Sequence, residues 1–459
     1  MTGTKSEEQA TRADGDVLAA AAAAAAAEKK ELVKARWAIL RQALLGVQPL
    51  SSAVNIQHSM NSFAGFRVLD RVVIQDDDKE YSDLVAKCIV DEGGEEEEEE
   101  VSSSWDFVQN SYTSKNGEKI QFITREVRQH QLKQHQQCTS QSSLKSRVEA
   151  LLSHRNHGVD NTGNVRVWDA EATLAGFLLS VLLGSDADLE ATSDFTKVDD
   201  LKSRIKTALF ENETGIVDYG QQTCNILELG AGQAGLAGLS VASATTSVDN
   251  LKPLHLLLTD GHPKCVKNNR SCEKLMQLGR NVTVHAQLLL WDSSAKGAEE
   301  CQRINRESHN STIEVDGQTL RDGSFHICLA SDCLHFQDFH DALLATIART
   351  LAVGGIALLC QPQRGSSLGN FMSMIDAVNA PQAIGDSAGS KCNQSSKQPL
   401  FHMTLIEDFY PKVSAMHKTL ISDEAHANKQ YDPNRHRPLL LVLRKLRHYD
   451  EEVHGHRVR

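Results

Sequence analysis

The feature that most limits how this chain can fold is an alternation of short apolar runs with helical patterns, which begins near Val165. Seven runs have the length of a strand and lie at residues 225–229, 254–259, 282–288, 325–331, 356–361, 403–406 and 439–443. Helical patterns at 235–244, 263–278, 338–351 and 368–377 separate most of them. Such alternation is typical of α/β proteins. We therefore predict a doubly wound, seven-stranded, Rossmann-like sheet.

The first third of the chain has a different composition. Residues 1–30 are polar, charged and then alanine-rich, so we expect a disordered tail there. We expect residues 31–150 to form a smaller N-terminal α+β accessory domain, with a helix at 31–45 and a solvated acidic loop. Residues 151–459 then make up the main domain. Two polar stretches in it, 293–324 and 380–399, are expected to be surface insertions.

The charge balance limits the choice of partner. The chain has 48 Lys and Arg against 60 Asp and Glu, a net charge of -12 at pH 7. This surplus argues against a role in binding nucleic acid. Eight of the acidic residues lie in 91–100, however, so the rest of the chain is much closer to neutral and can still present basic residues to an acidic protein.

Cysteine usage and the amino-terminal residues bear on localisation. None of the ten cysteines has Cys-x-x-Cys spacing, which favours a reduced, intracellular protein. We expect it in the cytoplasm, with the nucleus as a further location. The apolar run at 17–27 is shorter than the ~20 residues of a membrane span, so we expect no membrane partner. His154 and His157 lack further ligands in register, and no metal site is expected. The chain is expected to be a monomer.

A glycine-rich segment follows the first of the seven predicted strands. Gly230, Gly232 and Gly235 satisfy the pattern Gly-x-Gly-x-x-Gly between an apolar strand and an apolar helix. Glycines there let the chain turn sharply and let backbone N–H groups approach a ligand. Three interpretations are open: a dinucleotide, S-adenosyl-L-methionine, or no ligand and a role in packing alone.

Two carboxylates help to choose between these interpretations. Glu228 precedes Gly230 by two residues, where its charge would repel a pyrophosphate but attract the ammonium and sulfonium groups of S-adenosyl-L-methionine. Asp260 ends the next strand and could hold two ribose hydroxyls. It follows Gly230 by 30 residues, longer than the about 20 of dinucleotide sites. We therefore favour S-adenosyl-L-methionine as the cofactor.

From about residue 161 to 446, the chain resembles the seven-β-strand, S-adenosylmethionine-dependent protein methyltransferases of the lysine-modifying branch. The segments that carry the resemblance are Asn161-Thr162-Gly163-Asn164-Val165-Arg166-Val167-Trp168, Leu227-Glu228-Leu229-Gly230-Ala231-Gly232, Leu258-Thr259-Asp260-Gly261, Leu290-Trp291-Asp292, Ala330-Ser331-Asp332-Cys333-Leu334, Gln363-Arg364-Gly365-Ser366 and 436–441. Residues 35–42 also resemble the N-terminal helix of the members that act on calmodulin.

The resemblance implies transfer of methyl groups from S-adenosyl-L-methionine to a lysine of calmodulin, with trimethyllysine as the product. It also implies a cofactor site that includes Ser331 and has Trp291 beside the adenine ring. Trp168 could cover the cofactor or only pack against the helix that follows. Methylation of another protein, or a cofactor-binding scaffold without catalysis, remains open as an alternative.

Asp332 and His335 are candidates for the chemistry, and Arg364 is a candidate for substrate binding. Asp332 could accept a hydrogen bond from the substrate amine and stabilise the charge that develops on nitrogen; capping the next helix is its alternative role. His335 could act as a base, line the lysine channel or lie on the surface; the family commonly has an aromatic residue at this position, and Phe336 follows one place later. Arg364 could face an acidic substrate or lie on the surface.

Overall fold

The computed structural model describes residues 65–76, 78–89, 105–127, 167–184, 194–210, 223–291, 314–315, 318–319, 323–335, 337–380, 398–422 and 431–449. All of them belong to one compact unit, which spans Phe63–Gln129 and His154–Arg459. The predicted boundaries at residues 30 and 150 lie outside the described residues, so the domain division stays a prediction.

A seven-stranded sheet forms the centre of this unit, in the order β11-β12-β10-β9-β4-β5-β6. Its strands are β4 (Cys224–Leu229), β5 (Leu254–Asp260), β6 (Val282–Leu288), β9 (Phe325–Ser331), β10 (Leu351–Gln361), β11 (Phe401–Ile406) and β12 (Leu439–Lys445). Neighbours from β10 to β6 are parallel, and β12 is antiparallel to both β10 and β11. The seven predicted strands and the doubly wound sheet are confirmed.

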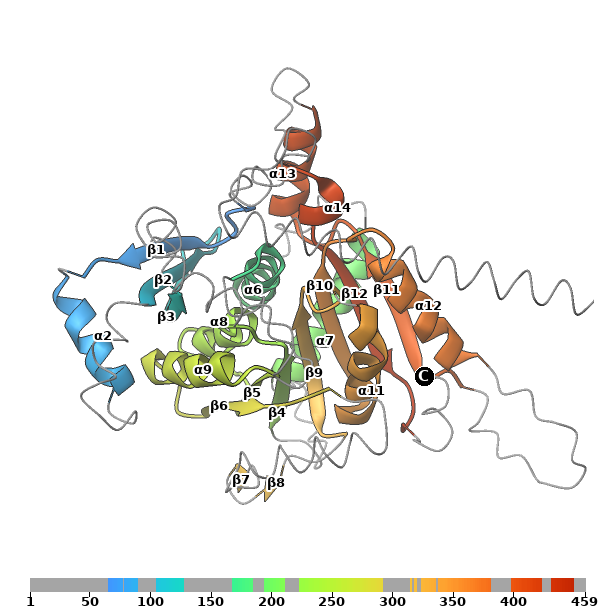
Figure 1. The fold of residues 1–459 in the computed structure, drawn as a ribbon, viewed down its shortest axis with the longest axis horizontal. Coiled ribbons are helices and arrows are strands. Elements are labelled where there is room, and N and C mark those ends of the chain that lie inside the picture. Colours follow the sequence, from blue (N-terminus) through green and yellow to red (C-terminus); the bar gives the residue numbers. More distant parts are fainter. Residues whose placement is uncertain are drawn as a thin grey trace, which may run out of the picture. The chain divides into compact units, whose positions relative to one another are not determined.

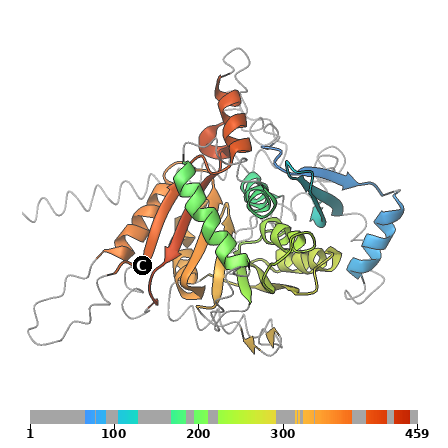
Figure 2. The ribbon, with the colours of Figure 1, turned by 180° about the vertical axis from the view of Figure 1, so that it is seen from behind.

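Helices cover both faces of this sheet (Figure 1). One face carries α6 (Asp169–Leu183), α7 (Phe195–Leu209), α8 (Leu236–Ala244) and α9 (Pro263–Leu275); Figure 2 shows α7 lying across the strands. The other face carries α11 (His340–Thr350), which follows the short 3₁₀ helix η4 (Gln337–Phe339), and α12 (Ser367–Asn379). Successive side chains of β9 point to opposite faces of the sheet. Ile327 packs on the face that carries α6 to α9, and Cys328 packs on the face that carries α11 and α12.

A second, three-stranded antiparallel sheet precedes the seven-stranded one in the chain. It contains β1 (Asp70–Ile74), β2 (Trp105–Thr113) and β3 (Lys119–Val127), with α2 (Lys79–Ile89) between β1 and β2. In both ribbon views it lies beside α8 and α9, and Arg125 of β3 donates from its Nη1 to Ser271 Oγ of α9 at 2.9 Å. The described part of the accessory region thus packs directly on helices of the central sheet.

Several helices were not predicted. Among them, α7 buries Val198, Leu201, Ile205 and Leu209, a spacing that was readable in the sequence. The helix α13 (Pro411–Ser422) and the short α14 (Pro433–His436) connect β11 to β12. Inside the insertion predicted at 293–324, β7 (Glu314–Val315) pairs with β8 (Gln318–Thr319). Among the described helices, none has the length and apolar character needed to cross a membrane.

Candidate active site

The predicted site residues collect at the carboxyl-terminal ends of the parallel strands. Asp260 ends β5, Ser331 ends β9, the glycine loop follows β4, and Arg364 follows β10. In open α/β sheets, ligands bind outside this edge. The elements that carry the predicted chemistry therefore converge, although they come from distant parts of the sequence.

The glycine loop turns sharply and lies against two neighbouring loops. Gly230, Gly232 and Gly235 have φ angles of 64°, 57° and 54°. A Cβ atom on Gly230 would lie 2.8 Å from Cys333 Sγ and 3.3 Å from Trp291 Cζ2. Only glycine fits there, because the backbone conformation is left-handed and the space is already filled.

The Asp260 carboxylate binds the loop directly. Gly232 N–H donates to Asp260 Oδ2 at 2.9 Å, and His262 N–H donates to Oδ1 at 2.7 Å. Asp260 is buried. The end of β5 is thereby fixed against the glycine loop, at the place where we predicted that ribose hydroxyls would bind.

Glu228 has a role that we did not predict. Its carboxylate is fully buried and accepts a hydrogen bond from the N–H of Gly238, in the first turn of α8, at 2.8 Å. Glu171 of α6 accepts from Leu236 N–H, in the same turn, at 2.7 Å. Both carboxylates thus satisfy N–H groups that have no partner within the helix. Burial and, to a lesser degree, the charge of Glu171 raise the pKa of Glu228 well above its ordinary value.

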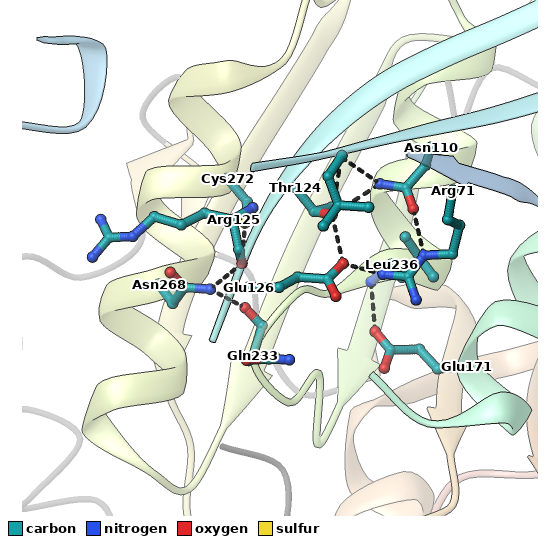
Figure 3. Close-up of polar contacts among 11 residues, drawn as sticks. Arg71, Asn110, Thr124, Arg125, Glu126, Glu171, Gln233, Leu236, Asn268 and Cys272 are labelled. Carbon is teal, nitrogen blue, oxygen red and sulfur yellow. Dashed lines mark hydrogen bonds and ion pairs between the residues drawn. The ribbon is translucent and has the colours of Figure 1, made fainter. Parts of the chain in front are cut away.

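Figure 3 shows that Glu171, bonded to Leu236, adjoins a network in the three-stranded sheet. Arg71 of β1 forms an ion pair with Glu126 of β3 and donates from Nε to Asn110 Oδ1 at 2.9 Å. Thr124 Oγ1 bonds Glu126 Oε1 at 2.9 Å. Burial is the main cause that raises the pKa of Glu171 to about 8; of the nearby charges in the sheet, Glu126 raises this pKa and Arg71 lowers it. The accessory sheet therefore acts electrostatically on the group that caps the glycine-loop helix.

Asp332, Arg364 and Trp168 form a second group. The Arg364 guanidinium binds the Asp332 carboxylate through two hydrogen bonds, with Nε to Oδ1 at 2.8 Å and Nη2 to Oδ2. Arg364 Cζ also lies 5.6 Å from the centre of the Trp168 ring. Asp332 and Arg364 have φ angles of 55° and 47°. Such angles are uncommon for residues other than glycine, and backbone strain of this kind is often found at functional sites.

The loop that follows β9 is held by a further set of bonds. Asp332 N–H donates to the carbonyl oxygen of Cys360 at 2.9 Å, and Leu334 N–H donates to Gln361 Oε1 at 3.2 Å. The carbonyl oxygen of Leu334 is bonded by Ser367 Oγ and lies 3.2 Å from His340 Nε2. These contacts hold the backbone on both sides of Cys333.

The remaining predicted residues lie around this loop. His335 is exposed, and Phe336 lies outside the described residues. Ser331 Oγ and Trp291 Nε1 are buried, and among the described residues neither atom has a hydrogen-bond partner. A buried polar atom without a partner is costly, and ligand binding relieves that cost.

We did not predict a role in the site for Glu171, Gln361, Ser367 or His340. Glu171 was visible as an acidic residue in the first turn of an otherwise apolar helix, but its partner Leu236 was not. Among the described residues, no group of three potential metal ligands lies together. His154 and His157 lie outside those residues.

The residues at this edge fit the predicted cofactor. The glycine loop brings backbone N–H groups to the edge of the sheet, and Asp260 offers carboxylate oxygens beside Gly232. Trp291 adds an aromatic ring against Gly230, and Ser331 and Trp291 bring the unpartnered polar atoms described above. These residues would hold S-adenosyl-L-methionine.

The chain is similar in sequence to a known protein. A curated relative, calmodulin-lysine N-methyltransferase from Arabidopsis thaliana, is 29% identical over 221 residues, or 48% of this chain and 56% of the relative. The chain thus matches little more than half of that protein's length.

Solved structures of methyltransferases are also similar to it. A TehB-like, SAM-dependent methyltransferase from Corynebacterium glutamicum aligns over 55% of this chain and 98% of its own, with 13% identity and a TM-score of 0.26. A predicted O-methyltransferase from Agrobacterium tumefaciens aligns over 48% and 74%, with 15% identity and a TM-score of 0.25.

The match that shows the family covers half of the chain. A sequence model described as "Lysine methyltransferase" matches residues 148–378, from before α6 to the end of α12. This range contains the glycine loop, Asp260, Trp291, Asp332 and Arg364. S-adenosyl-L-methionine is the methyl donor that the family indicates. The chain belongs to the lysine methyltransferase family.

Proposed function

We propose that this protein transfers methyl groups from S-adenosyl-L-methionine to the ε-amine of a lysine in calmodulin, with trimethyllysine as the product. The observation that carries the proposal is the similarity to the Arabidopsis calmodulin-lysine N-methyltransferase over 221 residues. An acidic protein substrate is compatible with the charge of this chain, because most of the chain's surplus of acidic residues lies in residues 91–100.

In this proposal, the described residues divide the work between two groups. Gly230, Gly232, Asp260, Ser331 and Trp291 hold the cofactor. When bound, S-adenosyl-L-methionine supplies an electrophilic methyl group on a positively charged sulfur. Glu171 and Glu228 keep the first turn of α8 in place beneath the glycine loop, through the N–H groups of Leu236 and Gly238.

The second group positions the acceptor. Displacement at a methyl carbon needs a neutral amine in line with the bond that breaks, so orientation and electrostatics supply most of the rate. Asp332 accepts a hydrogen bond from the amine and stabilises the positive charge that develops on its nitrogen. The bonds to Cys360, Gln361, Ser367 and His340 hold the loop that carries this carboxylate. The proton that leaves the amine passes to solvent.

The test is methyl transfer to purified, unmethylated calmodulin by the full chain with radiolabelled S-adenosyl-L-methionine. Intact-mass analysis of the calmodulin should show a gain of three methyl groups, and peptide mapping should place all three on one lysine. Labelling of a methylation-deficient lysate in parallel shows whether the dominant product has the size of calmodulin.

Each result bears on an alternative. A dominant product of another size would make the chain a lysine methyltransferase for another protein. Binding of the cofactor in calorimetry without turnover on calmodulin or lysate would indicate a scaffold. We also propose that the protein is a monomer, which light scattering tests, and that it works in the cytoplasm and nucleus, which imaging of a tagged chain tests.

A further inference from the structure

The Asp332 carboxylate, which is proposed to meet the substrate amine, is already bound to a cation of the protein. Arg364 contacts both of its oxygens, and the side chains of Asp332 and Arg364 are 7% and 20% exposed. An arginine that binds both oxygens of a carboxylate forms a strong ion pair, and its two bonds fix how the two groups are oriented. The carboxylate therefore attracts a third, positively charged group less strongly than an unpaired carboxylate would, while its remaining lone pairs can still accept a hydrogen bond.

Arg364 is held in place from three sides. Its backbone N–H donates to the carbonyl oxygen of Asn434 at 2.8 Å, and the next residue, Gly365, donates to Asn434 Oδ1 at 3.0 Å. The guanidinium also lies over the Trp168 ring. These contacts orient Arg364 toward Asp332, which differs from the sequence-based expectation of an arginine that faces an acidic substrate.

The charge of the carboxylate matters because only the neutral amine is nucleophilic. An unpaired carboxylate within about 4–6 Å of an ionisable group favours that group's charged form. It would therefore keep a lysine protonated and unreactive. A carboxylate that is neutralised by a fixed guanidinium offers the same hydrogen bond without this penalty.

We propose that Arg364 is a positioning residue that neutralises Asp332, so that the site accepts the neutral form of the substrate lysine. This inference rests on the proposed lysine methylation. In this inference, Arg364 acts on the lysine that accepts the methyl group and does not bind an acidic partner directly.

Three further titratable groups interact electrostatically with the pair. The thiols of Cys333 and Cys360 lie close enough to feel the charge of Asp332, and burial raises the pKa of both well above its usual value. From α14, His436 feels the charge of Arg364, and burial lowers its pKa. Because the two thiols and the imidazole are neutral, Arg364 is the cation among these groups that compensates the charge of Asp332.

The test compares the pH dependence of kcat, which reports the ionisation of groups in the enzyme–substrate complex, for the wild type and Arg364→Gln. Loss of the guanidinium should move the acidic limb to higher pH by about one unit, the lower end of the shift expected for a nearby charge. At pH values below the limb, kcat should then fall about tenfold, and the loss should shrink as the pH rises through the limb. An equal loss at every pH would overturn the proposal, because a purely structural role predicts that result.

Two further variants sharpen the comparison. Arg437→Gln removes another partly buried arginine, 18% exposed, whose Nη2 lies 2.7 Å from Asp408 Oδ1, and it should leave the limb in place. Adding Asp332→Asn to Arg364→Gln removes the uncompensated carboxylate, so the limb should return toward its wild-type position even though kcat is low. Circular dichroism and melting curves confirm that each variant is folded.

A binding measurement separates this inference from the choice of substrate. With S-adenosylhomocysteine bound, Arg364→Gln should bind n-butylammonium, a mimic of the protonated lysine side chain, about tenfold more tightly than the wild type in calorimetry. Equal affinities would overturn the role of Arg364. If the wild type fails to methylate calmodulin, the proposed function fails, and the n-butylammonium result still decides the inference.

Discussion

Glu171 of α6 accepts a hydrogen bond from the backbone N–H of Leu236, 65 residues later in the chain, at 2.7 Å. Three residues before Glu171, Trp168 forms the N-cap position of the same helix and carries the ring that lies against Arg364. One turn of α6 therefore contacts both the helix of the glycine loop and the Asp332–Arg364 pair. We infer that α6 fixes the distance between the cofactor loop and the acceptor loop.

The buried carboxyl group of Glu171 makes stability depend on pH. Its pKa of about 8 lies above the ordinary value of 4.5, so the folded protein keeps a proton there that the unfolded chain has already released. Between these values the free energy of unfolding falls as the pH rises, by at most about 1.4 kcal/mol per unit. Glu171→Gln, which is neutral at any pH, should escape this loss.

Melting curves at pH 5, 6, 7, 8 and 9 test this. The melting temperature of Glu171→Gln relative to the wild type should rise with each step and then level off above pH 8. Glu118→Gln, which replaces an exposed carboxylate in the turn before β3, serves as the control and should show a constant difference. A constant difference for Glu171→Gln as well would mean that Glu171 is charged in the folded protein.

Replacing Asp332 should impair turnover with little effect on binding of the cofactor. We expect Asp332→Asn to lower kcat by about 10²–10³-fold, as for the loss of one group that stabilises charge in the transition state. The affinity for S-adenosylhomocysteine, measured by calorimetry, should change by less than a factor of three.

Asparagine is the informative substitution at this position. The φ angle of Asp332 is 55°, and Asn tolerates this left-handed conformation about as well as Asp does, whereas Ala does not. Asp332→Ala should therefore lose melting temperature in addition to activity. Wild-type turnover by Asp332→Asn would remove this residue from the chemistry.

Gly230→Ala should destabilise the protein and weaken cofactor binding together. A left-handed conformation costs an L-residue about 1–2 kcal/mol. The new methyl group would also meet Cys333 Sγ at 2.8 Å. Adding Cys333→Ala removes the sulfur and should recover the part of the melting temperature that is due to the collision, while the part due to φ remains. A Gly230→Ala protein with wild-type stability would contradict the geometry of this loop.

The strands could be predicted because each is an apolar run between polar or glycine-containing segments, and burial on both faces of a parallel sheet requires such runs. The largest difference from the predicted strands is at β10, which was expected to begin at residue 356. It begins at Leu351, because that residue pairs with Phe325 of β9. The register between the two strands then shifts before Ile356. The predicted helix at 338–351 ends at Thr350 for the same reason. Boundaries of this kind depend on the neighbouring strand and cannot be found from one segment alone.

For the candidate site, the sequence predicted the residues better than their partners. Asp332 and Arg364 were both identified, but from separate motifs, 32 residues apart, and no local pattern indicates that they form an ion pair. Glu228 was expected beside the cofactor, and its bond to Gly238 depends on how α8 packs beneath the glycine loop. That role of Glu228 beside the cofactor stays a prediction, as do the roles of the other site residues.

The carboxylate of Asp260 offers the most direct test of the cofactor site. If its oxygens hold ribose hydroxyls in addition to Gly232 and His262, Asp260→Asn should weaken binding of S-adenosylhomocysteine by about 10–100-fold, because a hydrogen bond to a charged group contributes about 1.5–3 kcal/mol. Asp249→Asn, in the exposed turn after α8, is the matched control and should bind as the wild type does. Calorimetry with 2′-deoxy and 3′-deoxy analogues then identifies the hydroxyl concerned: an analogue that lacks it should bind the wild type and Asp260→Asn with similar affinity. If Asp260→Asn binds the natural compound as tightly as the wild type does, the carboxylate serves only to fix Gly232, and the ribose must be held by other residues of the site.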